Sequence, residues 1–453
     1  MNPRLRSILI GIGLLTLVII AIVLIPRGLS IYYQSRGGQH IDYVMRSVEG
    51  IQELVCEPLP ESKRGAIEEV ESGIEDLNRA ARFNRRNAHT YYQLGKAYCL
   101  LGEPENALES YQQYTQLRPD NPLGYIGLGF AYEVIEDSEK SKNAWNDAGL
   151  KPHEFNAVGD EFFRVDNYEE AMLWYERALL INPSNINSIF SIGLINEDLG
   201  DWLSAIDNYE RVVSIEPSNA KAYYEIGEIL YNQFNHFEES LFYFNKASEF
   251  DSLPVKAFVG IGDANYRMGN NEEALSAYQK AVDLSYRVEG NLSEDQWNRV
   301  WPHYALGSMQ FNLEQYDDAQ ESFLKGLELD TNDRWSGWLL WGLGRISLLA
   351  EDYDHSNEYF SQILEVTDYV FLRSQAYYGL GLSSINKGDI QTGLMLLKSA
   401  IEEHPQNRDM YLVYIGKLIE YNSIERAKEE LQIYLNNWPE DKEAQDLLIN
   451  ISN

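Results

Sequence analysis

Four short glycine pairs are the stretches of this chain that most resemble a phosphate-binding loop. They are the Gly-x-Gly stretches at 127–129, 260–262, 342–344 and 379–381. A dinucleotide-binding loop needs a third glycine and a preceding strand, which let backbone N–H groups face the phosphate. None of the four stretches continues to a third glycine or follows a strand pattern. Each second glycine instead recurs at a fixed place in a longer repeated pattern, so we interpret these glycines as structural.

Histidines and carboxylates are the next candidates for chemistry. The seven histidines are spread singly along the chain, and no His-Glu-x-x-His or Cys–His pairing gives metal-ligand spacing. Acidic pairs such as Glu169-Glu170 and Asp317-Asp318 stand beside predicted turns, where a helix start favours negative charge. No nucleophile motif is present, and the repeated pattern runs almost to the C-terminus. The sequence therefore predicts a protein that is not an enzyme, with no metal and no cofactor.

Charge and cysteine content exclude further classes. The chain of 453 residues has 37 Lys and Arg against 70 Asp and Glu, a formal net charge of −33. Nucleic-acid binding is not expected, because that affinity depends on cations that neutralise phosphates. Cys56 and Cys99 are the only cysteines. They are too few for a disulfide-rich scaffold, and the sequence leaves open whether they pair or stay as free thiols.

The N-terminus carries an apolar run from Ile8 to Ile25 without a charged residue. As a helix this run would be about 27 Å long, close to the thickness of a bilayer core. Ile25-Pro26-Arg27 is a poor cleavage site, so we expect an uncleaved single-pass anchor rather than a signal peptide. The short preceding tail favours a cytoplasmic N-terminus and an exported remainder (periplasmic, extracellular or lumenal). A cytosol-facing remainder is the alternative.

Internal repetition organises the rest of the chain. Pro183 and Pro217 lie 34 residues apart, as do Pro405 and Pro439. Between such marks one pattern returns about ten times, with Leu-Gly or Ile-Gly, an aromatic residue, and then Ala before another aromatic residue. One unit reads Tyr91-x-x-Leu94-Gly95-x-x-Tyr98, then Ala107-x-x-x-Tyr111, then Pro119. Each unit holds two stretches of helical period separated by a turn such as 101–104.

This pattern resembles the tetratricopeptide repeat (TPR) family. The resemblance implies an all-α fold, a right-handed superhelix (α-solenoid) of about ten helix-turn-helix repeats, here preceded by one transmembrane helix. No unit can bury its apolar face alone, so neighbouring units are expected to stack into a continuous core. The small Gly and Ala positions would let paired helices approach closely, with the aromatic side chains filling the space around them.

The register of the pattern divides the chain into six segments. They are the anchor at 1–30, juxtamembrane and N-capping helices at 31–87, six repeats at 88–284, an irregular insertion at 285–296, four repeats at 297–439, and a C-terminal capping helix at 440–453. Within the second segment, helices are expected at 40–56 and 66–84, separated by Pro58-Leu59-Pro60. The insertion breaks the register, which suggests two sub-arrays joined by a loop or a bend.

The resemblance also implies a binding surface. In the family, the first helix of each unit lines a concave groove that binds a peptide or a segment of another protein. The groove positions carried onto this chain, which flank the Leu-Gly pair, are Tyr92, Phe130, Asp160, Phe163, Phe190, Glu197, Tyr224, Glu228, Tyr231, Asp263, Tyr266, Tyr304, Trp338 and Trp341. The alternative for many of these aromatic residues is packing between neighbouring helices. Some family members grip an acidic peptide with Lys and Asn, but Tyr92 and Asp160 interrupt that pattern here.

These observations lead to two hypotheses of function. The first is a membrane-anchored scaffold or adaptor that binds a protein or peptide segment, basic or proline-containing, through its aromatic and acidic groove. The alternative is a carbohydrate-associated protein of the cell envelope, in which Trp338 and Trp341 stack on a glycan.

Overall fold

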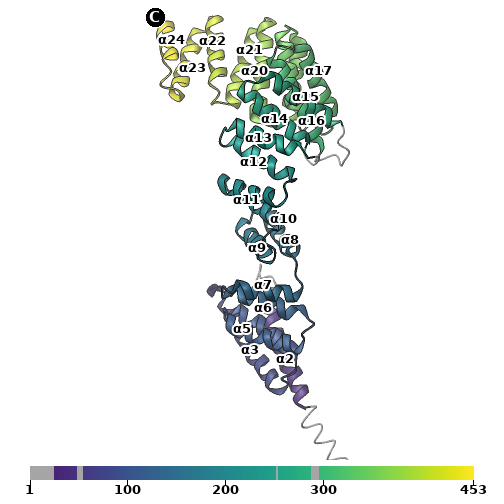
Figure 1. Ribbon diagram of the computed structural model, residues 1–453. Helices are drawn as coiled ribbons and strands as arrows, with labels where there is room; N and C mark the ends of the chain where they lie inside the picture. Colours follow the sequence, from purple (N-terminus) through teal and green to yellow (C-terminus); the bar gives the residue numbers. More distant parts are fainter. Residues whose placement is uncertain (1–24, 48–54, 251–253, 287–294, 453) are drawn as a thin grey trace, which may run out of the picture. The chain divides into compact units, whose positions relative to one another are not determined.

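The protein is all-α throughout the part that the computed structural model describes, residues 25–47, 55–250, 254–286 and 295–452 (Figure 1). Those residues contain no β-strand. The expected transmembrane helix lies outside the described residues except for Ile25. None of the described helices combines the length and apolar character needed to cross a bilayer.

The chain divides into two compact units between Asp201 and Trp202. The first unit contains one 3₁₀ turn, Glu61–Lys63, and nine described α-helices. These helices are α2 (Ile25–Ser47), α3 (Arg64–Phe83), α4 (Ala88–Leu100), α5 (Pro104–Leu117), α6 (Pro122–Val134), α7 (Ser138–Ala148), α8 (Pro152–Phe163), α9 (Tyr168–Ile181) and α10 (Ile186–Asp198).

The second unit begins with α11 and ends near the C-terminus. Its described helices are α11 (Trp202–Ile215), α12 (Ala220–Asn232), α13 (Phe237–Ser248), α14 (Pro254–Met268), α15 (Asn271–Ser285), α16 (Asp295–Asn312), α17 (Tyr316–Leu329), α18 (Ser336–Leu349), α19 (Tyr353–Val366), α20 (Val370–Asn386), α21 (Ile390–Glu403), α22 (Arg408–Glu420), α23 (Ile424–Asn437) and α24 (Lys442–Ser452).

A left-handed residue marks the turn inside each repeat. From α4/α5 to α22/α23, all ten turns between paired helices contain one residue with positive φ. They are Gly102, Glu136, Asp166, Gly200, Asn235, Gly269, Glu314, Glu351, Gly388 and Asn422. At the first of them, the Gly102 amide donates to the Cys99 carbonyl and the Glu103 amide to the Tyr98 carbonyl. This geometry ends a helix by satisfying its last carbonyls, and it occurs at the turn of each of the ten units that the sequence pattern predicts.

In seven repeats the glycine of the pair lies against an aromatic ring of the next helix, whereas Gly381 lies against Leu397. A Cβ atom added to Gly95 would lie 2.6 Å from the Tyr111 ring, and one added to Gly227 would lie 2.7 Å from the Phe244 ring. Both distances are too short for a carbon–carbon contact, so a larger residue would push the paired helices apart. These glycines therefore serve helix packing, as the sequence predicted.

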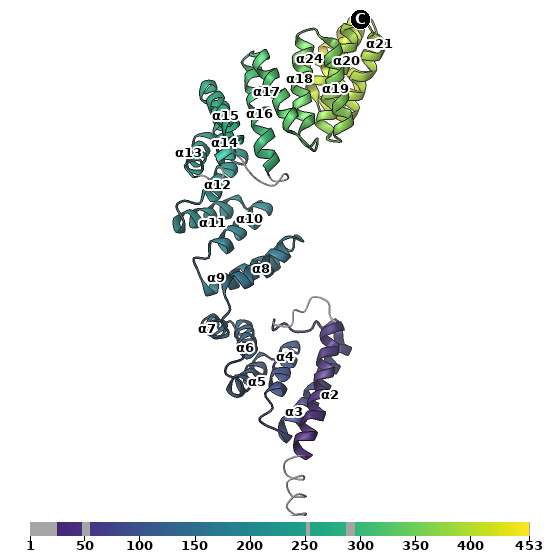
Figure 2. The same ribbon diagram turned by 90° about the vertical axis from the view of Figure 1, so that its right-hand side faces the viewer.

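The N-terminal helices differ from the expectation in one place. α3 matches the helix predicted at 66–84, but the helix predicted at 40–56 instead begins at Ile25 and ends at Ser47. α2 packs along α3 because Gly37, in its middle, brings the backbone against the Leu77 side chain. The two helices lie side by side in both views (Figures 1 and 2).

A disulfide bond joins Cys56 to Cys99, which resolves the open question of their pairing. Cys56 belongs to the segment before α3, and Cys99 to the last turn of α4. Both are 4% exposed within a core cluster, and the Leu59 amide nearby donates to the Leu100 carbonyl at 2.8 Å. The segment that leads into α3 is thus fixed to the first repeat.

The register break at 285–296 does not divide the array into two compact units. α15 and α16, on either side of it, belong to the same unit. One core cluster includes Ala281 and Val282 from α15 together with Leu306 and Met309 from α16. The apolar faces of α15 and α16 thus pack together across the insertion, and the division into sub-arrays at 285–296 stays a prediction.

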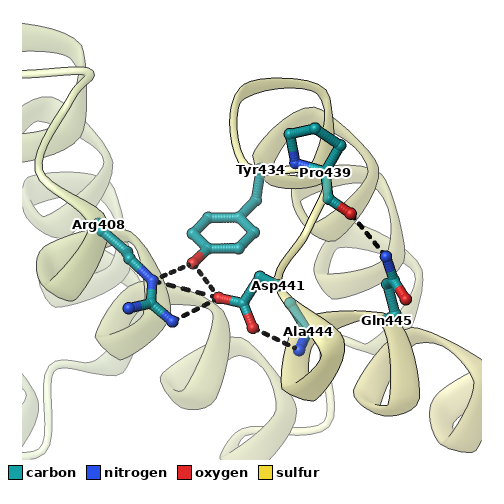
Figure 3. Close-up of polar contacts among 6 residues, drawn as sticks. All are labelled: Arg408, Tyr434, Pro439, Asp441, Ala444 and Gln445. Carbon is teal, nitrogen blue, oxygen red and sulfur yellow. Dashed lines mark hydrogen bonds and ion pairs between the residues drawn. The ribbon is translucent and has the colours of Figure 1, made fainter.

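The last helix is held by a polar network on its N-terminal turn (Figure 3). Asp441 accepts hydrogen bonds from Arg408 at 2.7 Å, from the Tyr434 hydroxyl at 2.6 Å and from the Ala444 amide at 3.2 Å. These bonds, that from Tyr434 above all, lower the pKa of Asp441 to about 2. The Asp441 side chain is 6% exposed, so the network links α24 to α22 and α23 away from most solvent.

We expect Asp441→Ala to loosen α24. The change removes a helix cap and takes away the carboxylate that accepts from the buried Tyr434 hydroxyl, which would cost about 2 kcal/mol. Because the pKa of Asp441 is lowered from 3.8, its contribution is complete above that value and is lost as the pH falls toward 2. Hydrogen exchange of the α24 amides is the measurement. Glu440→Ala, at the exposed neighbouring residue, is the control, and equal exchange in both variants would contradict the prediction.

Candidate functional site

An open pocket lies in the second unit among the first helices of three consecutive repeats. It has a volume of about 350 Å³. Four of the predicted groove residues line it together: Tyr231 from α12, Asp263 and Tyr266 from α14, and Tyr304 from α16. The structure thus brings residues from three repeats to one site, as the resemblance implied.

Asp263 is the central polar group of this pocket. It follows the repeat glycine Gly262 on α14, and its Oδ1 accepts a hydrogen bond of 2.6 Å from the Tyr278 hydroxyl. Burial above all, with the nearby charge of Glu228, raises the pKa of Asp263 to about 7 against the opposing effect of the hydrogen bond from Tyr278. Among the described residues, no Lys or Arg forms an ion pair with Asp263.

Tyr278 occupies the aromatic position after Ala274 in the repeat pattern, and the pattern does not indicate a role for its hydroxyl. Its ring is 4% exposed and packs on Gly262, yet its hydroxyl reaches the pocket and bonds Asp263. The same arrangement occurs in the first unit, where the Tyr175 hydroxyl donates to Asp160 at 2.7 Å. In each pair the aspartate and the tyrosine are fifteen residues apart in the sequence. An acidic residue after the repeat glycine, followed at that distance by Tyr, is the signal that could have predicted them.

Arg267 is a second pocket residue that the sequence did not single out. Its guanidinium lies over the rings of Phe237 at 4.6 Å and Tyr231 at 5.7 Å. The positive charge of Arg267 therefore makes cation–π contacts with these two rings at one side of the pocket.

Beyond Tyr304, the aromatic residues of α16 and α18 form a packed group. Trp338 stacks on Phe371 with ring centres 5.6 Å apart and also contacts Tyr304. The Arg345 guanidinium lies 4.7 Å from the Trp341 ring centre and 3.9 Å from that of Phe311. Burial lowers the pKa of Arg345, a residue that we had not predicted for the groove. One face of each tryptophan is therefore covered by protein, which leaves the glycan alternative without support.

The remaining predicted residues occupy different environments. Phe130 is 2% exposed and packs against Trp145 and Trp174, so its assignment to the groove is corrected to the core. The helical pattern placed it beside the glycine, but the aromatic side chains of the following helices cover that position. Tyr92, Phe163, Phe190, Glu197, Tyr224 and Glu228 are half-buried, and Asp160 is exposed.

Of these, Tyr92 contacts Tyr114, with ring centres 5.4 Å apart, and Phe163 contacts Tyr168 at 5.8 Å. The ring centre of Tyr224, on α12, lies 5.6 Å from that of Phe244. The predicted groove residues up to Glu197 belong to the first unit, and those from Tyr224 onward belong to the second. Within the described ranges, no three His, Cys, Asp or Glu side chains are grouped so that they could hold a metal ion.

Paired helices with left-handed turns, stacked through glycine–aromatic contacts, define an α-solenoid of repeats. Models of the TPR repeat match residues 95–133 and 198–233, and tetratricopeptide repeat models match 155–185, 255–287, 302–333 and 385–451. The chain therefore belongs to the tetratricopeptide repeat family. Members of this family are generally non-catalytic scaffolds that bind proteins or peptides.

Curated relatives match only in part. The chain is 21% identical over 285 residues to a TPR repeat-containing protein of Methanocaldococcus jannaschii, covering 55% of this chain and 47% of that protein. It is 25% identical over 211 residues to the protein CTR9 homolog of Arabidopsis thaliana, covering 46% of this chain and 18% of that protein. The chain thus spans less than half the length of these relatives.

The chain is also similar to solved structures, at low sequence identity. The crystal structure of the APC/C hetero-tetramer Cut9-Hcn1 contains a similar chain at 13% identity, with a TM-score of 0.43. The match covers 85% of this chain and 94% of that one.

Proposed function

We propose that the protein is a membrane-anchored, exported scaffold that binds a basic segment of a partner protein in the Asp263 pocket. The observation that carries the proposal is a half-buried carboxylate in an open pocket without a cation partner among the described residues. Such a group has unfavourable solvation, and a Lys or Arg side chain from a partner would compensate for it.

The walls of the pocket support the same class of partner. Tyr231, Tyr266 and Tyr304 line the site together with Trp301. Aromatic faces attract cations and also pack well on aliphatic stems and proline rings. A basic or proline-containing segment therefore fits both the charge and the surface of the pocket.

Arg345 adds a feature that an acidic groove alone would lack. The position after the repeat glycine holds Glu228, Asp263, Ser308 and Arg345 on α12, α14, α16 and α18, the first helices of four consecutive repeats. Within the described part of the chain, Arg345 has aromatic contacts but no ion pair with a carboxylate. With helices packed 8–10 Å apart, α18 lies about 20 Å from α14, or about six extended residues. A segment with a basic residue and, about six residues away, an acidic residue would satisfy both groups.

Anchoring and export are the remaining parts of the proposal. The apolar run Ile8–Ile25 is long enough to span a bilayer. The disulfide between Cys56 and Cys99 supports an oxidising compartment for the repeats, because such bonds rarely persist in a reducing cytosol.

Peptide selection would test the binding activity. Random twelve-residue peptides would be displayed on phage and selected on the full chain embedded in nanodiscs. We expect enrichment of Lys or Arg, with an acidic residue about six positions away, and loss of binding on Asp263→Asn. The matched control is Asp160→Asn, which changes the equivalent aspartate–tyrosine pair of the first unit. Selection of peptides without basic residues, or equal losses in both variants, would refute the proposal.

A further inference from the structure

Two segments of this acidic chain contain no acidic residue. Among 453 residues with 70 Asp and Glu, the first is Asp42, and none lies between Asp76 and Glu103. Basic residues do occur in both segments. They include Arg27 and Arg36 in the first, and Arg79, Arg82, Arg85 and Arg86 in the second. These two segments therefore lack acidic residues in particular, and not charged residues in general.

The fold brings these two segments together. The Ser30 hydroxyl, at the start of α2, donates to the Ala80 carbonyl near the end of α3 at 3.0 Å. Tyr33 stacks on Phe83, with ring centres 5.9 Å apart and planes 4° from parallel. The turn after α3 is tied to α2 as well, since the Asn87 amide donates to the Gln34 side chain at 3.2 Å. The first turns of α2 and the last turn of α3 thus form one corner of the first unit (Figure 2).

The outer surface of this corner is basic and apolar. We call it the root face and define it by the exposed residues Arg27, Ile31, Tyr32, Arg82, Phe83, Arg85 and Arg86. Ile31 is 62% exposed, Tyr32 56% and Phe83 41%, which is high for large apolar side chains on neighbouring turns. In the described part of the chain, Arg27, Arg82, Arg85 and Arg86 have no ion pair, whereas Arg36 and Arg79 both pair with Asp76.

We infer that the root face binds the anionic headgroups of the membrane in which the chain is anchored. This inference rests on the proposed anchor. Ile25, the last residue of the apolar run, is also the first described residue of α2. Ile31 follows it by six residues, or about 9 Å along a helix. The headgroup region extends about 5–8 Å beyond the hydrocarbon core on each side. Arg27, two residues after Ile25, therefore lies within the headgroup region, and Ile31 lies at its outer boundary.

The chemistry of the root face matches this position. Tyrosine is enriched at the membrane–water interface, where the ring stays apolar and the hydroxyl is hydrated. Clusters of Arg beside a membrane helix attract anionic lipids and do so less at high salt. The rest of the chain is strongly acidic and is repelled by the same headgroups. The root face would therefore fix which end of the first unit contacts the bilayer.

The test compares the full chain in nanodiscs of zwitterionic phosphatidylcholine with discs that also contain anionic phosphatidylglycerol. Hydrogen exchange reports on the turn at 84–87, where the Arg85 amide makes no backbone hydrogen bond. We expect exchange at this turn to slow at least fivefold in the anionic discs, and the difference to disappear in 0.5 M NaCl. The triple variant Arg82→Gln, Arg85→Gln, Arg86→Gln should exchange equally in both kinds of disc.

A control variant separates this effect from net charge. Lys63→Gln, Arg64→Gln, Arg118→Gln removes the same charge from exposed positions of the first unit outside the root face, and should behave like the unmodified chain. Equal exchange of the unmodified chain in both kinds of disc would overturn the inference, as would protection only after a protein partner is added. Failure of the chain to co-purify with discs would refute the anchor and the root-face inference with it. Peptide binding at Asp263 would be unaffected by that result.

Discussion

Asp263→Asn is expected to weaken binding of a lysine-containing peptide at least tenfold at pH 8 without destabilising the protein. The amide still accepts the hydrogen bond from Tyr278, so the local structure is preserved. What is lost is the negative charge that a cationic side chain would neutralise. Isothermal titration calorimetry would measure the affinity of a selected peptide and of the same peptide with norleucine in place of lysine. The difference between the two peptides reports the contribution of the lysine charge. The norleucine peptide should bind both proteins equally.

The pH dependence follows from the raised pKa of Asp263. Below about pH 7 the carboxyl is protonated in the free protein, and a bound cation must displace that proton. Affinity for the lysine peptide should therefore rise up to about tenfold from pH 6 to pH 8 and then level off. The other titratable or charged groups that face or line this pocket are Glu228, Tyr231, Tyr266, Arg267, Tyr278 and Tyr304. In the Asn variant affinity should be constant over this range, and a slope that persists would assign the titration to another group.

The same carboxylate should reduce the stability of the unit at neutral pH. Since the folded-state pKa is raised from 3.8 to about 7, the folded protein holds a proton that the unfolded chain releases. Stability therefore falls as the pH rises through this interval. One pKa unit corresponds to about 1.4 kcal/mol, and with solvent in the open pocket we expect a cost of about 2 kcal/mol. Asp263→Asn should thus melt higher at pH 8, whereas Asp160→Asn should not.

Removal of the disulfide is expected to have the largest effect on stability. In Cys56→Ala, Cys99→Ala, the denatured chain regains the freedom of a loop that spans 43 residues. The loop-entropy relation gives a loss of about 4 kcal/mol. The loss should be local, because a repeat array transmits stability mainly between neighbours. Amides of α3 and α4 should exchange faster, while those of α20 to α23 in the second unit should not change.

Reduction provides the matched control for this prediction. The unmodified chain in dithiothreitol should reproduce the exchange pattern of the double variant, and the double variant itself should not respond to the reductant. If α3 and α4 remain equally protected in all three cases, the hydrogen bond from Leu59 to Leu100 and the surrounding core hold the segment without the covalent bond.

The repeat pattern predicted the fold well because its information is local. Each Leu-Gly pair and the aromatic residue that follows lie within one unit, and the structure places Gly95 against Tyr111 as that pattern implies. The turn residues Gly102 and Gly388 likewise end their helices within a few residues of sequence. The boundary between compact units was not predictable in this way. Whether the insertion at 285–296 separates the array depends on apolar contacts between α15 and α16, not on the register of the pattern.

The site could be predicted only in part from helical periodicity. The period correctly gathered Tyr231, Asp263, Tyr266 and Tyr304 on one face. It failed for Phe130, because the next helices cover that ring, and for Tyr278, whose hydroxyl extends beyond the core its ring occupies. A period gives the direction in which a side chain leaves its helix, but not how far it reaches or what covers it.

The amino-acid pattern alone predicts an acidic array of about ten helix pairs, since apolar spacing, small residues and turn residues act within each repeat. Which residues far apart in the chain become neighbours depends on how the helices pack. The tertiary structure joined Cys56 to Cys99, enclosed Asp263 beside Glu228 so that its pKa rises, and placed the acid-free start of α2 against the acid-free end of α3. Burial and electrostatic potential depend on distances in space, and stacking sets these between residues far apart in the chain.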